Sequence, residues 1–202
     1  MYKELKATIA ALDIEVISSE RKDVLKPLID YLRDKIEKNN PIRLNFICTH
    51  NSRRSHLSQV WAQVMANHYN INNVSCYSGG TEATAMFPKV GETLTNQGFQ
   101  ILKLSEGSNP VYSIKFDENA PSVIAFSKQF SDTFNPASEF AAIMTCSSAD
   151  QGCPIVLGCD KRIAITYEDP KVSDGTPVQT ETYLKRSVQI ATEMKYVFSS
   201  LN

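Results

Sequence analysis

A cysteine and an arginine separated by five residues stand where an apolar strand gives way to a helix. Residues 42–47 have the pattern of a buried central strand, and Cys-Thr-His-Asn-Ser-Arg-Arg-Ser, from Cys48 to Ser55, follows directly. A strand-to-helix loop points consecutive backbone N–H groups and the positive end of a helix into one concavity, which favours an anion and a thiolate. The planar guanidinium of Arg54 can hold two oxygens of a tetrahedral oxyanion there. The pattern predicts an enzyme with a nucleophilic thiol beside an oxyanion cradle.

Other residues of this loop suit the same chemistry. Ser55 can donate a hydrogen bond to the Cys48 thiolate, and Asn51 tolerates a left-handed backbone and can brace a tight loop through its amide. His50 and Arg53 add positive character or else face solvent. The predicted oxyanion-binding residues are Thr49, His50, Asn51, Ser52, Arg53, Arg54 and Ser55. The alternative is a buried, inert Cys48 at the end of a strand.

A second pair of cysteines, Cys146 and Cys153, follows the predicted strand 140–145. In a continuous helix their Cα atoms would lie ~10.5 Å apart, whereas a disulfide needs them within about 7 Å. Pairing them therefore requires the segment to unwind, and Gly152 and Pro154 both weaken a helix there. The segment is thus a candidate order–disorder switch. The alternative is two cysteines with no redox role.

A third candidate feature is Tyr-Glu-Asp-Pro, residues 167–170, after the predicted strand 162–166. A carboxylate on a loop that faces an oxyanion cradle can act as a general acid and then as a base. Asp169 is the candidate, stiffened by the neighbouring Pro170, and Glu168 competes for the role. Taken alone, Asp-Pro is a common turn.

The bulk composition is that of an ordinary globular protein. The chain has 202 residues, 42% hydrophobic and 21% charged, and a net charge of −1. This balance argues against nucleic acid as the main partner, and no apolar run reaches the ~20 residues that span a bilayer. Five cysteines without an apolar leader argue against a structural disulfide framework. We expect a cytoplasmic protein that needs neither a metal nor a cofactor and does not bind membranes.

The hydrophobic patterns predict alternating helices and strands. Helices are expected over residues 2–12, 21–38, 55–69, 87–97 and 180–199, and strands over residues 42–47, 74–78, 140–145 and 162–166. Residues 110–127 have a strand–turn–strand pattern. The alternation predicts a parallel, doubly wound α/β sheet, in which ligands bind beyond the carboxyl ends of the strands. Cys48, Cys146 and Thr166 would meet there.

Phe46–Ser55 together with Asp169-Pro170 resembles the low-molecular-weight tyrosine phosphatase superfamily. Within it, Cys146-x6-Cys153-Pro154 followed by Tyr-Glu-Asp-Pro is most similar to the thioredoxin-coupled arsenate reductases. The resemblance covers roughly residues 42–105 and 140–200. It implies a four-stranded parallel sheet flanked by helices. It also implies roles for five residues: Cys48 as nucleophile, Arg54 as oxyanion clamp, Asp169 as acid, and Cys146 and Cys153 as redox cysteines.

The chain departs from the family pattern in several places. The family usually has a small residue where Arg53 stands and often glycine where His50 stands. We expect one domain, residues 1–202, with a helical extension (1–40) and a phosphatase-like core (42–202) that carries a hairpin-like insertion near 106–139. Aromatic residues of the insertion are expected to pack it onto the sheet, a lid or a dimer contact being the alternative. Cys76 and Cys159 have no role in the family and are expected to be structural.

Three functions follow as hypotheses. The first is arsenate reduction: Cys48 attacks arsenate, Cys146 releases arsenite by forming a disulfide with Cys48, and Cys153 moves that disulfide to where a thioredoxin-like partner reduces it. The second is hydrolysis of phosphate monoesters of the phosphotyrosine type, which needs neither Cys146 nor Cys153. The third is an oxyanion-binding or redox-sensing protein without turnover.

Overall fold

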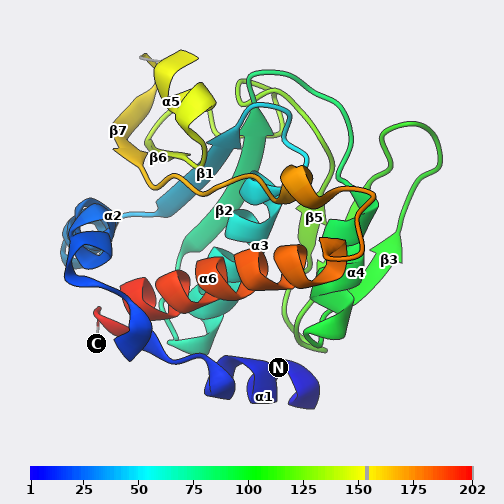
Figure 1. Ribbon diagram of the computed structural model, residues 1–202. Coiled ribbons are helices and arrows are strands. Elements are labelled where there is room, and N and C mark those ends of the chain that lie inside the picture. Colours follow the sequence, from blue (N-terminus) through cyan, green and yellow to red (C-terminus); the bar gives the residue numbers. More distant parts are fainter. Residues whose placement is uncertain (153–154, 202) are drawn as a thin grey trace.

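The computed structural model describes residues 1–152 and 155–201 (Figure 1). Its α-helices are α1 (Lys3–Ala11), α2 (Ser19–Glu37), α3 (Arg54–His68), α4 (Pro88–Asn96), α5 (Ser147–Gly152) and α6 (Gln179–Ser199), and its single-turn helices are η1 (Ile14–Val16) and η2 (Pro170–Ser173). Its strands are β1 (Ile42–Cys48), β2 (Val74–Gly80), β3 (Gln100–Lys103), β4 (Tyr112–Lys115), β5 (Val123–Ala125), β6 (Phe140–Met144) and β7 (Cys159–Ala164).

Four parallel strands form the central sheet, in the order β2-β1-β6-β7. Strand β1 lies inside the sheet, with Cys48 opposite Gly80 of β2 and Ile47 opposite Met144 of β6. The carboxyl ends of these three strands therefore meet at one edge, as the sequence predicts. The predicted fold, a four-stranded parallel sheet flanked by helices, is confirmed.

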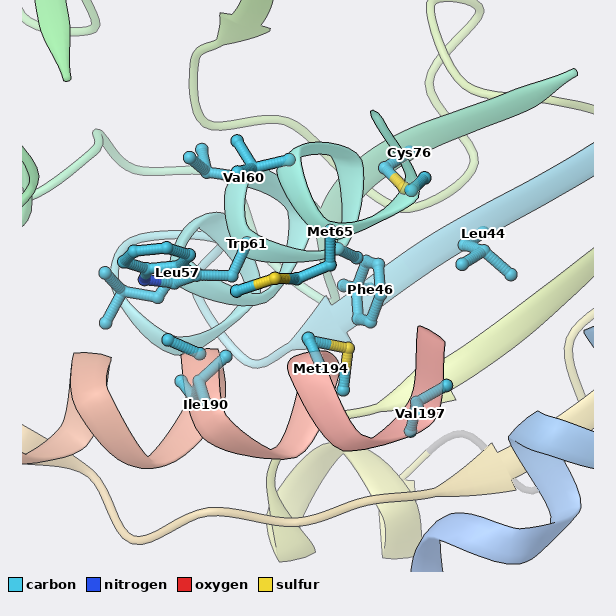
Figure 2. Packing of buried hydrophobic residues seen from close by; sticks show 14 of the residues in the cluster. Leu44, Phe46, Leu57, Val60, Trp61, Met65, Cys76, Ile190, Met194 and Val197 are labelled. Carbon is cyan, nitrogen blue, oxygen red and sulfur yellow. The ribbon is translucent and has the colours of Figure 1, made fainter. Parts of the chain in front are cut away.

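The two faces of the sheet are covered differently. Leu44 and Phe46 of β1 belong to the large core that they share with Trp61 of α3 and Met194 of α6 (Figure 2). The side chain of Ile47 points to the other face of the sheet. It belongs to a smaller cluster with Met144 of β6 and Ala149 of α5. The edge of the sheet that carries Cys48 thus has helices α3 and α6 on one side and the short α5 on the other.

The two N-terminal helices are part of the large core. Leu5 and Ile9 of α1 and Leu25, Leu28 and Leu32 of α2 are buried in it. Helix α2 continues through Pro27 for 19 residues, and the Ser18 hydroxyl caps its start by accepting a hydrogen bond from the Arg21 N–H at 3.2 Å. Figure 1 shows α2 beside the β7 side of the sheet and α1 below α6.

Strands β4 and β5 of the insertion form a second, antiparallel sheet with β3, which precedes the insertion, in the order β3-β4-β5. Strands β4 and β5 are the predicted strand–turn–strand pair, with Ile114 opposite Val123. The sequence does not predict β3, because its four residues, Gln-Ile-Leu-Lys, place two apolar residues side by side and show no apolar alternation.

After β5 the insertion returns to the central sheet. The Gly80 N–H donates to the Lys128 carbonyl, and the Phe130 N–H donates to the Gly80 carbonyl, both at 2.9 Å. The insertion therefore packs against the free edge of β2. The ring of its Phe134 also lies edge-to-face with Tyr77 of β2, 6.4 Å between ring centres, as expected of its aromatic residues.

One predicted strand is shifted in the structure. The last strand was predicted over residues 162–166 but is Cys159–Ala164. The chain after it stays beside β6, since the Ile165 and Tyr167 N–H groups donate to the Met144 and Thr145 carbonyls. The helix after β6 spans Ser147–Gly152. Cys153 and Pro154 lie outside the described residues, so the predicted Cys146–Cys153 pairing stays a prediction. Within residues 1–152 and 155–201, no helix is long and apolar enough to cross a membrane.

Candidate active site

The loop between β1 and α3 is held by a chain of hydrogen bonds that ends at Cys48. Asn51, fully buried, has the expected left-handed backbone (φ 44°). Its amide nitrogen donates to Ser55 Oγ at 2.9 Å, and its amide oxygen accepts from the Lys128 N–H at 2.9 Å. Ser55 Oγ lies 3.1 Å from Cys48 Sγ. Because the Ser55 oxygen accepts from Asn51, its own proton is free to donate to Cys48, which stabilises a thiolate there.

Glycine at position 80 lets the loop pack against the end of β2. A Cβ atom there would lie 2.4 Å from the Glu82 carbonyl oxygen, 2.6 Å from that of Thr49 and 2.7 Å from the Asn51 nitrogen. No side chain fits this contact. The sequence shows only a Gly-Gly pair at the end of a predicted strand, so the importance of Gly80 for the loop becomes visible only when β2 is placed beside β1.

Arg54 and Asp169 lie together at the mouth of the loop. The Arg54 guanidinium donates to the Tyr167 carbonyl at 2.9 Å and to Asp169 Oδ2 at 2.5 Å. Asp169 caps the start of η2 by accepting a hydrogen bond from the Lys171 N–H at 3.1 Å. An oxyanion bound by Arg54 would therefore lie next to the carboxyl group of Asp169. Glu168, the competing candidate, has a 93% exposed side chain and pairs with Arg186 instead.

Arg53 belongs to a separate aromatic and ionic cluster. Its guanidinium donates to the Tyr183 hydroxyl and to Asp174 Oδ2, both at 2.6 Å, and stacks 4.1 Å from the centre of the Phe87 ring. Burial acts to raise the pKa of Asp174, but hydrogen bonds from Tyr183 and Gln179 and the charge of Arg53 outweigh it and lower that pKa. Arg53 is thus held in place and neutralised by its partner, a role that the sequence does not reveal.

Six of the predicted residues line one small pocket: Cys48, His50, Ser52, Arg53, Arg54 and Asp169. The His50 side chain is 43% exposed and lies 3.5 Å from Glu82 at the rim. Asn51 and Ser55 are buried behind the loop. The residues predicted from the Cys-x5-Arg spacing and the distant Asp169 are therefore brought together in the structure.

Cys146 lies at the neighbouring strand end, beside the loop. Its side chain is buried, and its Sγ lies 3.5 Å from Thr49 Oγ1 and accepts a hydrogen bond from the Ala149 N–H at 3.3 Å. Cys48 and Cys146 belong to the same buried cluster. Cys159 begins β7, opposite Phe140 at the far end of β6, so it lies away from this edge.

Two buried basic side chains lie behind the loop, and sequence patterns do not single them out. His56 of α3 is fully buried with Nδ1 3.2 Å from Ser78 Oγ; burial, with the nearby charge of Lys128, lowers its pKa to about 3. Burial also lowers the pKa of Lys128, to about 8. Among the described residues, no three His, Cys, Asp or Glu side chains gather as a metal site would require.

Comparison with solved structures identifies the fold. A low-molecular-weight phosphotyrosine phosphatase from Vibrio cholerae O395 is 11% identical with a TM-score of 0.51, over 79% of this chain and 95% of that one. The chain has the fold of low-molecular-weight tyrosine phosphatases. The tyrosine phosphatase of this type from T. tengcongensis is 16% identical with a TM-score of 0.51, over 79% of this chain and 99% of that one.

An arsenate reductase in its phosphate-binding state matches equally well, at 15% identity and a TM-score of 0.50 over 80% of this chain and 99% of that one. No protein-family model and no curated protein matches the sequence. The low-molecular-weight phosphatase fold thus accommodates both activities that the sequence suggests, and the choice between them rests on the residues of the site.

Proposed function

We propose that this protein is a thiol-dependent arsenate reductase. The observation that carries the proposal is the position of Cys146: a second buried thiol, 3.5 Å from the Thr49 hydroxyl of the oxyanion loop, in one cluster with Cys48. Simple hydrolysis through Cys48 has no use for a second thiol at this place.

The first step is attack by the Cys48 thiolate on arsenic. The loop N–H groups and Arg54 hold the arsenate oxygens, and the oxyanion competes with Asp169 for the Arg54 guanidinium. The freed Asp169 carboxylate can then take up the proton that the Cys48 thiol loses and pass it to the departing hydroxyl group, which leaves as water. The product is arsenic(V) bonded to the sulfur of Cys48.

The second step transfers two electrons. The Cys146 thiolate attacks the Cys48 sulfur and forms a disulfide, and the electron pair of the broken S–As bond stays on arsenic, which leaves as arsenite. Cys153 would then attack Cys146 and free Cys48, and a thioredoxin-like dithiol would reduce the Cys146–Cys153 disulfide. The part of Cys153 is carried by the sequence resemblance alone.

The test is NADPH consumption with thioredoxin, thioredoxin reductase and arsenate. The wild type should turn over, and Cys48→Ser, Cys146→Ser and Cys153→Ser should each lose multiple turnover. Cys159→Ser is the matched control, because this cysteine begins β7 away from the loop, and it should keep wild-type activity. Full turnover by Cys146→Ser would contradict the relay.

A second candidate, hydrolysis of phosphate monoesters, is favoured by a cleft beside the loop. The cleft has a volume of about 400 Å³ and is lined by the loop residues His50, Ser52 and Arg53, by Thr84–Pro88, and by Lys171. Its size suits an organic leaving group, which arsenate lacks. Hydrolysis of p-nitrophenyl phosphate that is rapid and unchanged in Cys146→Ser would establish this function instead.

A further inference from the structure

Arg54 depends for its position on a segment without regular structure. Residues 165–169, between β7 and η2, supply both of its partners: the Tyr167 carbonyl and the Asp169 carboxylate. Figure 1 shows the chain after β7 (orange) running along α6 before it turns back into that helix. Whatever holds Tyr167 therefore sets where Arg54 and Asp169 lie.

The Tyr167 side chain is held by a buried carboxylate. The Tyr167 hydroxyl donates to Glu193 Oε2 of α6 at 2.8 Å. Burial and the negative charge of Glu193 raise the pKa of Tyr167 well above its ordinary value, so the hydroxyl stays a donor. Gln189, one turn earlier on α6, donates to Glu193 Oε1 at 3.1 Å.

The negative charge of Glu193 is balanced by an arginine of the N-terminal extension. Arg21, in the first turn of α2, donates through Nε to Glu193 Oε1 at 2.9 Å and through its terminal nitrogen to Oε2 at 2.8 Å. Its guanidinium also lies 5.0 Å from the centre of the Tyr167 ring. The Glu193 side chain is 3% exposed, so the carboxylate relies on this bidentate pair to remain buried beside Tyr167.

Resting on the function proposed above, we propose that Arg21 is a positioning residue of the active site. Through Glu193 and Tyr167, the extension holds the backbone that presents the Tyr167 carbonyl to Arg54 and carries Asp169. Displacing a catalytic group by about 1 Å can cost on the order of a hundredfold in rate. The extension, which lies outside the region of family resemblance, is then part of the apparatus that prepares the oxyanion site.

The test compares Arg21→Ala and Arg21→Lys with two controls. Arg33→Ala removes another link from α2, a 2.7 Å bond to the Ser200 carbonyl at the end of α6, which does not reach the site. Leu5→Ala removes a fully buried side chain of α1, at a position whose backbone packs against Gly98, and so reports what destabilisation alone does. All are assayed for kcat and KM where urea titration shows them fully folded, and for binding of inorganic phosphate by calorimetry.

Arg21→Ala should lower kcat/KM and phosphate affinity by about tenfold or more. Arg21→Lys should recover part of both losses, since it keeps the charge beside Glu193 but not the bidentate geometry. The two controls should match the wild type. Wild-type kinetics and phosphate affinity in folded Arg21→Ala, or the same loss in Leu5→Ala, would overturn the proposal.

The phosphate measurement separates this proposal from the function. If the wild type turns over neither arsenate nor p-nitrophenyl phosphate, the proposed function fails. Weaker phosphate binding by Arg21→Ala would still support the positioning role, and unchanged binding would still refute it.

Discussion

Cys48 owes its surroundings to neighbours that are themselves fixed from elsewhere in the chain. Ser55, seven residues on, lies 3.1 Å from its sulfur, and Asn51 orients Ser55. Asn51 in turn accepts from the Lys128 N–H, 77 residues away in sequence. The residue that contacts the Cys48 thiol is thus close in sequence, whereas the hydrogen bond that fixes the loop behind it comes from a distant part of the chain.

The buried side chain of Lys128, behind the loop, should make the stability of the protein depend on pH. Its Nζ lies 4.3 Å from the centre of the Phe126 ring and 3.3 Å from the Phe126 carbonyl oxygen. Burial lowers its pKa from 10.5 to about 8, so between these values the folded protein has released a proton that the unfolded chain still holds. Stability then rises with pH across this window, by at most about 3 kcal/mol.

Lys128→Met removes the titrating group and keeps the backbone N–H that Asn51 needs. The free energy of unfolding of the wild type, relative to this variant, should increase from pH 8 to pH 10.5, as measured by urea titration. A constant difference over this range would show that the ammonium is not destabilised by its burial.

At the scale of elements, the loop from Cys48 to Arg54 depends on a close fit between β1, β2 and the insertion. Gly80 of β2 contacts the loop backbone on one side and forms two hydrogen bonds with the 128–130 segment on the other. The insertion therefore adds an isolated bridge, Gly80 opposite Gln129, beside the loop, and its Phe116 is buried in the large core.

Gly80→Ala should displace the loop, because the new Cβ would lie within 2.7 Å of three backbone atoms. We expect kcat/KM to fall by about a hundredfold. Gly91→Ala on α4 is the matched control, since its Cβ would meet nothing closer than 3.7 Å and alanine favours a helix by roughly 0.5–1 kcal/mol. The prediction is wrong if Gly80→Ala retains wild-type kinetics.

At the scale of the molecule, the extension and the central sheet share one core. Leu28 and Leu32 of α2 are fully buried with Ile163 of β7 and Val197 of α6 in the same cluster. The extension cannot be lost without exposing apolar surface of the sheet and of α6.

Leu28→Ala should therefore destabilise the whole protein, by about 2–5 kcal/mol, in a single cooperative transition. Val24→Ala on the same helix, where the side chain is 37% exposed, should change stability by no more than about 0.5 kcal/mol. Urea unfolding followed by circular dichroism and by Trp61 fluorescence measures both. Separate transitions for the two signals in the wild type would contradict the shared core.

The sequence by itself determined the strand–loop–helix unit, the parallel sheet and the candidate nucleophile, clamp and acid. These depend on hydrophobic periodicity and on contacts within a few residues, such as the left-handed Asn51 beside Ser55. Strand β3 was missed because its four residues show no alternating pattern, and the start of β7 was missed because its first half is mostly charged and has no apolar run.

Only the tertiary structure decided what holds these groups in place. Arg54 meets Asp169 across 115 residues, and Arg21 meets Glu193 across 172. Arg53, which lines the pocket with Cys48 as predicted, is held there by Asp174 and Tyr183 of the C-terminal part of the chain. No local pattern marks such pairs, because each partner is an ordinary charged residue until packing buries it beside the other.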